Sequence, residues 1–260
     1  MAQFQRYIGI DYSGAETADS RCKGLRVYIA EGTGTPVQVQ PPPSPRRYWT
    51  RRGLAEWLHE ELDRDIPTLV GIDHAFSFPL AYFERYRLSS DWPTFLVDFR
   101  RHWPTDEPGT YIDFIRDGNV GEGAKRMGDT GWLRLTERWT ATAKSVFLFD
   151  VQGAVAKSTF AGLPWLLHLR SKCKRPIHFW PFDGWDIPQG ESAIVEVYPS
   201  LWTRRFPKEG RDGDEQAAYA VAAWLQRADL SGTLGSYFNP PLTPEELGIA
   251  RIEGWILGVV

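Results

Sequence analysis

Short apolar runs and one helical repeat of apolar positions give the first part of the chain a β-β-β-α-β order. Strands are predicted at residues 7–11, 25–30, 37–40 and 68–73, each bounded by polar or turn residues. Thr50 can cap a helix whose apolar positions follow helical spacing: Leu54, Trp57, Leu58 and Leu62. The first strands are close enough in sequence to pair antiparallel, and the helix predicts a crossover that brings 68–73 parallel to 7–11.

The pattern loosens from about residue 78 to residue 188, a stretch rich in Trp, Pro and Arg. Short helices are predicted at 92–101 and 161–169, and the run Val146–Asp150 is compatible with a strand. The proline-rich stretch 41–45 is expected to be a stiff, extended connector.

A regular pattern returns near the end of the chain. Residues 193–198 form a predicted strand ended by Pro199, and residues 214–228 form a predicted helix. Asp212 and Glu215 have capping-box spacing at the start of this helix. The apolar tail 254–259 is expected to pack against the sheet.

These elements predict an α/β fold with a mixed sheet flanked by helices. We expect a single domain over 1–260, with a core at about 1–79 and 189–260. Residues from about 80 to 188 form a large insertion between the fourth and fifth core strands, which could cap the core.

Composition excludes several protein classes. Of 260 residues, 42% are hydrophobic and 24% charged, with a formal net charge of −3, which excludes collagen-like, disulfide-framework and wholly disordered chains. The two cysteines, Cys22 and Cys173, have no C-x-x-C spacing, which argues against a zinc site and against a secreted disulfide scaffold. No apolar run reaches the roughly 18 residues of a membrane span. We therefore expect a cytoplasmic protein with no membrane association.

Two predicted strands end in the same tripeptide, Gly9-Ile10-Asp11 and Gly71-Ile72-Asp73. If the strands are parallel neighbours, both carboxylates lie at the sheet edge where α/β proteins bind ligands. Glu196 lies within a third strand, and Asp214 in the first turn of the late helix. Converging carboxylates need a cation, and hard oxygen ligands suit Mg²⁺ or Mn²⁺. Two such ions can clamp a phosphodiester for hydrolysis.

Each acid also has a simpler interpretation. Asp11 and Asp73 could each end a strand and open a turn. Glu196 could form a structural ion pair with an arginine. Asp214 could only complement the helix dipole.

The chain resembles a domain-of-unknown-function family of predicted nucleases with an RNase H-like fold. The motifs that carry this resemblance are Ile8-Gly9-Ile10-Asp11, Val70-Gly71-Ile72-Asp73, Val195-Glu196-Val197-Tyr198-Pro199, the helix from Asp214 to Ala222 and Glu253-Gly254-Trp255-Ile256. The resemblance implies an RNase H-like mixed sheet and a divalent-metal site holding Asp11, Asp73 and Glu196. The family pattern has an acid where this chain has Ala217, and Asp214 lies one turn earlier.

Four residues are weaker candidates for substrate contact. Ser13 lies in a polar loop just after Asp11. Lys157 and Ser158 lie in Gly153–Thr159, which is similar to a phosphate-binding loop but lacks two glycines of the Walker pattern. Arg51 belongs to the first of two basic clusters described next.

Basic residues are interleaved with aromatic residues in two clusters, 46–52 and 170–180. Aromatic rings beside cations suit single-stranded nucleic acid as a partner. The alternative is a solvated basic surface whose aromatic rings face the core.

Three functions are compatible with the sequence. The leading one is a metal-dependent nuclease, in which an activated water hydrolyses a phosphodiester. The second is an RNase H-like binding scaffold without catalysis, which Ala217 keeps open. The third is an ATP-binding phosphotransferase of the actin-like fold, for which glycine-rich loops are too few.

Overall fold

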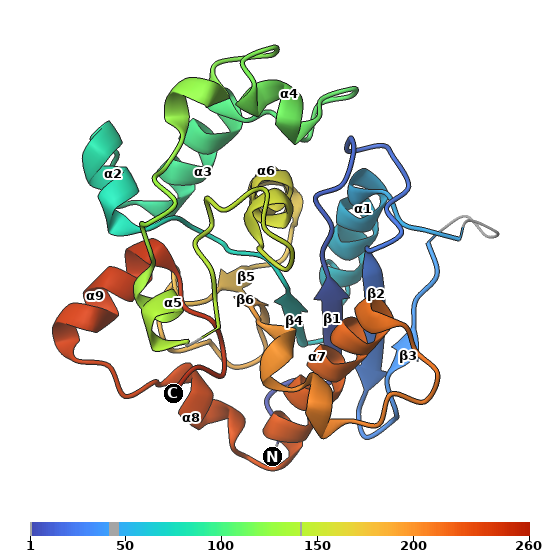
Figure 1. The fold of residues 1–260 in the computed structure, drawn as a ribbon. Helices are drawn as coiled ribbons and strands as arrows, with labels where there is room; N and C mark the ends of the chain where they lie inside the picture. Colours follow the sequence, from blue (N-terminus) through green and yellow to red (C-terminus); the bar gives the residue numbers. More distant parts are fainter. Residues whose placement is uncertain (1, 42–46, 141) are drawn as a thin grey trace.

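Six strands form one mixed sheet in a computed structural model that describes residues 2–41, 47–140 and 142–260 (Figure 1). The strand order is β3-β2-β1-β4-β6-β5. The strands are β1 (Arg6–Asp11), β2 (Arg26–Glu31), β3 (Val37–Gln38), β4 (Thr68–Ile72), β5 (Ile177–Phe179) and β6 (Ser192–Glu196). Strand β1 pairs antiparallel with β2 and parallel with β4, as predicted. The α/β class and the mixed sheet are confirmed.

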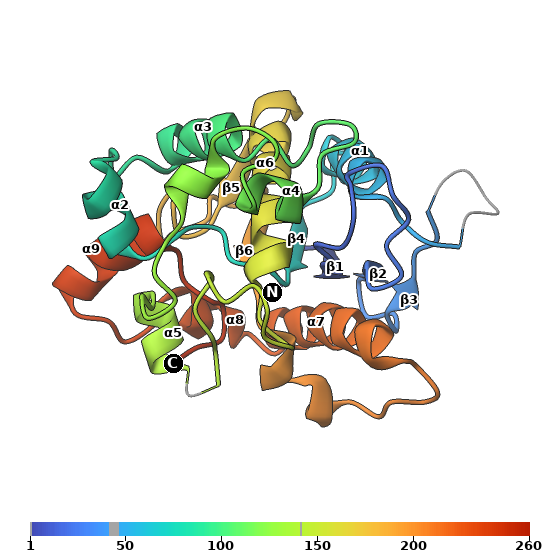
Figure 2. The same cartoon turned by 45° about the horizontal axis from the view of Figure 1, so that its top comes forward.

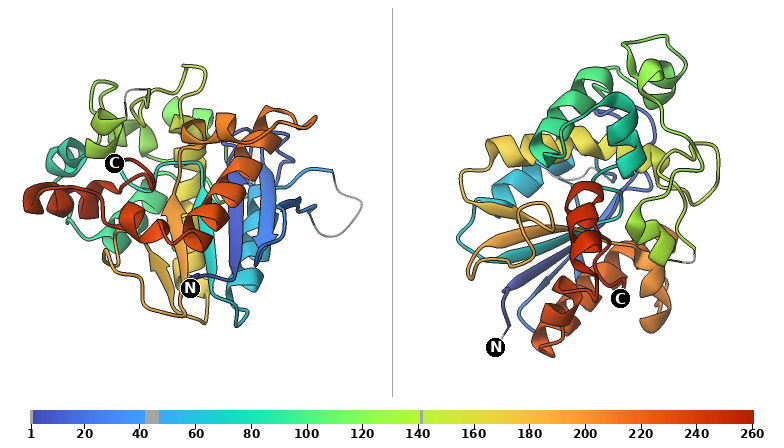
Figure 3. Two further views of the ribbon diagram at one scale, coloured as in Figure 1. Left: turned by 90° about the horizontal axis from the view of Figure 1, so that it is seen from below. Right: turned by 90° about the vertical axis from the view of Figure 1, so that its left-hand side faces the viewer.

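Helices cover both faces of this sheet. Helices α1 (Arg51–Leu62) and α6 (Ala156–Lys172) lie on one face, and α7 (Gly213–Leu230) lies on the other (Figure 3, right). Helix α6 lies between α1 and α3 (Trp92–His102) and contacts both (Figure 2). The remaining helical segments are α2 (Leu80–Tyr86), α4 (Ile112–Arg116), η1 (Gly123–Arg126), α5 (Leu135–Trp139), η2 (Pro199–Leu201), η3 (Thr203–Arg205), α8 (Leu234–Phe238) and α9 (Pro244–Glu253).

The predicted helix caps are present. Thr50 Oγ1 accepts a hydrogen bond from the Gly53 amide at 2.9 Å at the start of α1. At the start of α7, the Glu215 amide donates to Asp212 Oδ1 at 2.8 Å, and the Asp212 amide donates to Glu215 Oε2 at 3.0 Å. Each cap satisfies backbone donors that the helix leaves unpaired, so the sequence defines both starting points.

Strand alternation divides the apolar residues into two cores. Ile8, Ile10 and Ile72 pack against α1, α6 and the aromatic residues of the insertion. Tyr7 and Leu69 belong to the second core, which includes α7 and the C-terminal tail. In that tail, Trp255 and Leu257 are buried, and the Leu257 amide donates to the Glu196 carbonyl at 2.9 Å, so the predicted packing of the tail is confirmed.

The insertion that lies outside the layered core is shorter than the predicted range 80–188. Helix α6 and strand β5 fall within 80–188, yet α6 covers the sheet and β5 pairs in parallel with β6. Strand β5 has only three residues, too few to show an alternating pattern. The large helical insertion therefore lies between β4 and β5, and its last helix belongs to the layered core.

The strand considered for Val146–Asp150 is wrong, because this segment forms turns. Its apolar residues are explained by side-chain packing. Phe147 is buried, and its ring centroid lies 4.9 Å from that of Phe78. Most of the proline-rich stretch 41–45, together with Arg46, lies outside the described residues. Among the described residues, no helix combines the length and hydropathy that crossing a membrane requires.

The distance between α7 and the sheet depends on Gly9 and Gly71, which are register partners on β1 and β4. A Cβ atom on Gly9 would collide with the Ala218 carbonyl and lie 2.6 Å from the Ala222 amide nitrogen. A Cβ atom on Gly71 would lie 2.7 Å from Val221 Cγ1. The glycine of each Gly-Ile-Asp motif therefore gives α7 room to lie directly on the strands.

We expect Gly9→Ala to destabilise the protein by about 1–3 kcal/mol or more. The new methyl group would meet the backbone of α7, which cannot rotate away as a side chain could. Urea unfolding measures this effect. Gly248→Ala, at an exposed position of α9 with open space around it, is the matched control and should be neutral or stabilising by about 0.5–1 kcal/mol. Equal unfolding midpoints for the two variants would contradict the close contact.

Candidate functional site

Asp11 and Asp73 lie together at the carboxyl edge of β1 and β4. Each follows its glycine by two residues, and the Asp73 amide donates to the Ile10 carbonyl at 3.0 Å, which extends the parallel pairing to this point. Their carboxyl groups are within hydrogen-bonding reach of each other, and both residues remain partly accessible to solvent. The prediction that these strand ends bring two acids together is confirmed.

Acidic neighbours dominate the charge effects on this pair. Burial, followed by the charge of Asp73, raises the pKa of Asp11 well above its usual range. Burial, followed by the charge of Glu196, raises the pKa of Asp73 to about 7. Arg26 lowers the pKa of Asp11, but its guanidinium is already 3.2 Å from Asp212 and 3.7 Å from Glu215. A bound cation would relieve the repulsion between the two carboxylates.

Asp214 approaches the pair from the first turn of α7. It precedes Ala217 by three residues, so the two positions lie on the same side of the helix. The charge of Asp214 contributes to raising the pKa of Asp11, and burial raises the pKa of Asp214 itself. Gly24 lies between Asp214 and Ser13, because a Cβ atom there would be 3.5 Å from Asp214 Oδ2 and 3.6 Å from Ser13 Oγ. Asp214 and Ser13 therefore both border the edge that carries Asp11.

Glu196 is held differently from the other acids. It is the register partner of Ile72, which belongs to the core under α1 and α6. Arg134 binds both of its carboxylate oxygens, with Nη1 at 2.8 Å from Oε2 and Nη2 at 2.6 Å from Oε1. The Phe76 amide also donates to Oε2, at 3.1 Å. This is the structural ion pair that the sequence left open, and it gives Glu196 a cationic partner that it shares with Glu137.

Arg134 joins the insertion to the core. It is 1% exposed, its Nε donates to Glu137 Oε1 at 2.8 Å and its Nη1 donates to the Glu253 carbonyl at 3.2 Å. The Glu253 carboxylate in turn accepts from the Leu80 amide at 2.6 Å. Sequence reasoning missed Arg134, and the only available signal was its i,i+3 spacing to Glu137.

A narrow cavity of about 20 Å³, enough for one water molecule, lies beside Asp73. Arg134, Glu196 and Lys144 also line it. Lys144 Nζ donates to the Gln152 carbonyl at 2.7 Å, which holds this lysine near the site. Lys144 was not predicted, because it lies in the part of the insertion that has no regular pattern.

The segment with Lys157 and Ser158 does lie beside the acidic edge. A Cβ atom on Gly14 would collide with the Lys157 backbone and lie 2.6 Å from the Ser158 amide nitrogen, so the loop after β1 packs on the start of α6. The side chains themselves are engaged elsewhere. Lys157 Nζ is 2.9 Å from Asp113 Oδ2, and Ser158 Oγ donates to the Val155 carbonyl at 2.9 Å. The backbone at this helix start, rather than the two side chains, therefore borders the site.

Arg51 is corrected from a substrate-contact candidate to a residue that positions the loop. It is fully buried, and its guanidinium donates to the Ala15 carbonyl at 2.6 Å and to the Glu16 carbonyl at 2.9 Å. A third donation goes to the Ser13 carbonyl at 3.3 Å. Arg51 has no exposed surface with which to reach a substrate, and it instead holds the loop that carries Ser13.

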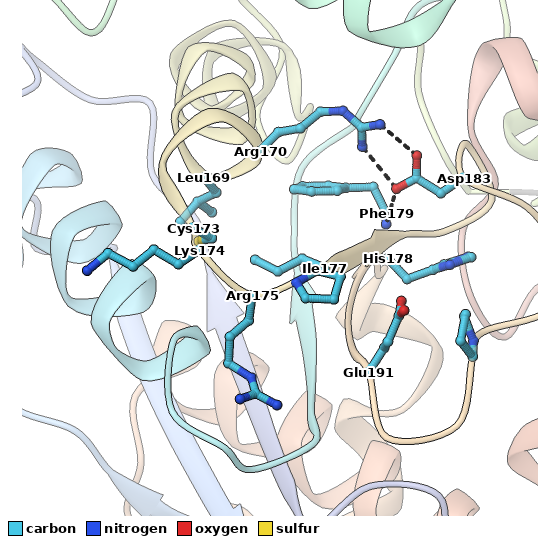
Figure 4. Close-up of a pocket in the computed structure, with 12 residues that line it drawn as sticks. Leu169, Arg170, Cys173, Lys174, Arg175, Ile177, His178, Phe179, Asp183 and Glu191 are labelled. Atoms are coloured by element: carbon cyan, nitrogen blue, oxygen red, sulfur yellow. Dashed lines mark hydrogen bonds and ion pairs between the residues drawn. The ribbon is translucent and has the colours of Figure 1, made fainter.

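Most aromatic rings of the two basic clusters face the core, but Tyr48 is half-buried, with Arg26 and Arg47 beside its ring. Trp49, Phe179 and Trp180 are each at most 2% exposed, so they cannot stack on bases. Arg170 binds both carboxylate oxygens of Asp183 at 2.8 and 2.9 Å (Figure 4). The buried rings match the alternative in which aromatic residues of these clusters belong to the core, and Tyr48 is the ring of the described cluster residues that stays partly accessible beside cations.

No protein-family model matches the chain, and neither the curated proteins nor the solved structures include a significant match.

We expect Arg134→Met to destabilise the protein by about 3–5 kcal/mol, because Glu196 would be left buried without its partner. Urea unfolding measures the change. Lys125→Met is the control, because Lys125 and Glu122 form an exposed pair at 3.2 Å whose loss should cost at most about 1 kcal/mol. If Arg134→Met were as stable as the wild type, the contacts of Arg134 with Glu196, Glu137 and Glu253 would not be what holds the insertion to the core.

Without divalent ions, the contribution of Asp73 to the stability of the folded state should become less favourable as the pH rises from about 4 to 7. The pKa of Asp73 rises from 3.8 to about 7 on folding, so in this window the unfolded chain is ionised while the folded one still binds the proton. Asp73→Asn should therefore be stabilised relative to wild type by about 1–3 kcal/mol at pH 8 and much less at pH 4. Unfolding in chelator tests this, with Asp186→Asn, an exposed acid, as the control. If the difference in stability between Asp73→Asn and the wild type did not change with pH, the raised pKa of Asp73 would be contradicted.

Proposed function

We propose that the protein is a divalent-metal-dependent nuclease whose active site is the carboxyl edge of β1 and β4. One observation carries the proposal. Asp11 and Asp73 are adjacent, enclosed by protein and short of positive charge, yet still open in part to solvent. A fold retains such a destabilising pair most readily where a cation binds it.

The donor set fits Mg²⁺ or Mn²⁺. Asp11 and Asp73 offer hard oxygen ligands. Asp214, whose charge acts on Asp11, could bind through water, since Mg²⁺ often takes only one or two carboxylates and keeps several waters. When bound, such an ion would polarise the phosphate and activate water. Glu196 would not need to ligate, since both of its carboxylate oxygens already accept hydrogen bonds from Arg134.

The residues around the edge suit a phosphodiester. The start of α6 packs against the loop that Arg51 holds, so its free amide groups lie near the site and favour an anion. Lys144, in the cavity beside Asp73, adds a positive charge for the substrate. The resemblance to RNase H-like predicted nucleases supports the same assignment, with Asp214 acting from one turn before the position of Ala217.

An inactive scaffold with the same fold is the second candidate. Two observations favour it: Glu196 is engaged by Arg134, and Ala217 stands where the family pattern has an acid. Within the described residues, nothing specifically favours the ATP-binding alternative.

Mg²⁺ or Mn²⁺ should raise the thermal unfolding temperature of the wild type at pH 8, because an ion at about 100 times its Kd stabilises the fold by about 2.7 kcal/mol. Asp73→Asn should lose this response. It should also lower Mn²⁺-dependent cleavage of a labelled single-stranded oligonucleotide by at least about 100-fold.

Asp186→Asn, purified in parallel, is the control for contaminating nucleases and should behave as wild type. Metal-dependent stabilisation without cleavage would favour the scaffold. Cleavage that persists unchanged in Asp73→Asn would overturn the proposed site.

A further inference from the structure

A second group of metal-ligating side chains lies at the opposite edge of the sheet from the acids. His59 Nε2, Asp63 and Cys173 Sγ each offer one ligand atom, and these atoms lie within 4.8 Å of one another. Among the described residues, this is the only such group of three His, Cys, Asp or Glu side chains. We propose that His59, Asp63 and Cys173 bind a transition-metal ion of the zinc type. This proposal is independent of the proposed nuclease function.

Two helix ends build the group. His59 lies in the last turn of α1, Asp63 is the C-cap of α1 and Cys173 is the C-cap of α6. The two helices contact each other, so their C-termini meet here. Because the C-terminus of a helix carries partial negative charge, two converging C-termini favour a cation between them.

The carboxylate of Asp63 is oriented for binding. Its Oδ1 accepts from the amides of Lys174 at 2.8 Å and Arg175 at 3.3 Å, the two residues after Cys173. These donors hold the pKa of Asp63 below its usual value, although burial acts in the opposite direction. Backbone bonds of this kind fix a ligand in place, and here they also tie the Cys173 turn to α1.

The second carboxylate oxygen faces His59. Asp63 Oδ2 lies 3.1 Å from His59 Nε2, but Nε2 is a buried atom with no hydrogen bond of acceptable geometry. Two ligands of a tetrahedral zinc ion are separated by roughly 3.3–3.7 Å, given bonds of about 2.0–2.3 Å. The distance between His59 Nε2 and Asp63 Oδ2 is therefore close to that of a ligand pair, while the angle between the two groups is poor for a hydrogen bond.

Cys173 determines which metal the group would select. A thiolate favours zinc-type ions over Mg²⁺, so this site and the all-oxygen acidic edge should take different metals. Burial, followed by the charge of Asp63, raises the pKa of the Cys173 thiol to about 12. Formation of the metal–sulfur bond would therefore release the thiol proton to the solvent, and binding should tighten as the pH rises.

A groove adjoins this position on the side of Cys173. Cys173 and Lys174 line an open pocket of about 560 Å³ that runs beside β5 (Figure 4). The side chains of His59 and Asp63 are 28% and 21% exposed, so neither is sealed from solvent. Three protein ligands leave a fourth tetrahedral position for water.

Titration of the reduced, full-length protein with Co²⁺ tests the site, because a cobalt–thiolate bond gives a charge-transfer absorption band that oxygen ligands do not produce. We expect the band in the wild type and its removal by Zn²⁺. Cys173→Ser should lose it, and Asp63→Asn should need at least about tenfold more Co²⁺. Absence of the band from the wild type at millimolar Co²⁺ would overturn the proposal.

Two controls isolate the site. Cys22→Ser removes the other thiol, and Asp73→Asn removes an acid of the opposite edge; both should keep the band. Zn²⁺ should raise the unfolding temperature of the wild type but not of Cys173→Ser, whose fold is checked by circular dichroism. A band that persists in Cys173→Ser, or equal stabilisation of both proteins by Zn²⁺, would contradict the assignment.

Discussion

The close contact between α7 and the sheet is the constraint on which the acidic edge depends. Helix α7 can lie directly on β1 and β4 only because Gly9 and Gly71 present no side chain to it. The same strand alternation that turns these glycines toward α7 turns Asp11 toward the start of that helix, where Asp214 lies. Each Gly-Ile-Asp motif therefore combines a packing requirement with a chemical one: glycine admits the helix, isoleucine fills the opposite core and aspartate forms the site.

Charge compensation separates Glu196 from Asp11 and Asp73. Glu196 has a bidentate arginine partner that is itself held by Glu137, so its charge is used to join the insertion to β6. Asp11 and Asp73 form no ion pair within the described part of the chain, and the cation that acts on Asp11 is already shared with Asp212 and Glu215. A buried ion pair is satisfied as it stands, whereas two adjacent carboxyl groups remain unfavourable until a proton or a cation binds. This difference supports assigning structure to Glu196 and chemistry to Asp11.

The sequence predicted what local patterns determine. The strand ends, the caps at Thr50 and Asp212 and the parallel pairing of β1 with β4 all follow from short-range signals. Strand register is not visible in this way, and the register of Ile72 with Glu196 decided which core Glu196 faces. Arg134 and β5 were missed because an isolated buried arginine and a three-residue strand produce no periodicity. The sequence also argued against a zinc site because it lacks a C-x-x-C motif, while the fold brings together three ligands from two helices that are distant in sequence.

The directions of α1 and α6 connect the two candidate sites. Both helices precede a parallel strand, so both start near the carboxyl edge and end near the amino edge of the sheet. Their starts adjoin the loop that carries Ser13, through Arg51 and Gly14, and their ends carry Asp63 and Cys173. Helix dipoles then favour an anion at the first edge and a cation at the second. One layer of two helices would thus favour phosphate at the acidic edge and a softer metal ion at the opposite edge, as the two proposals require.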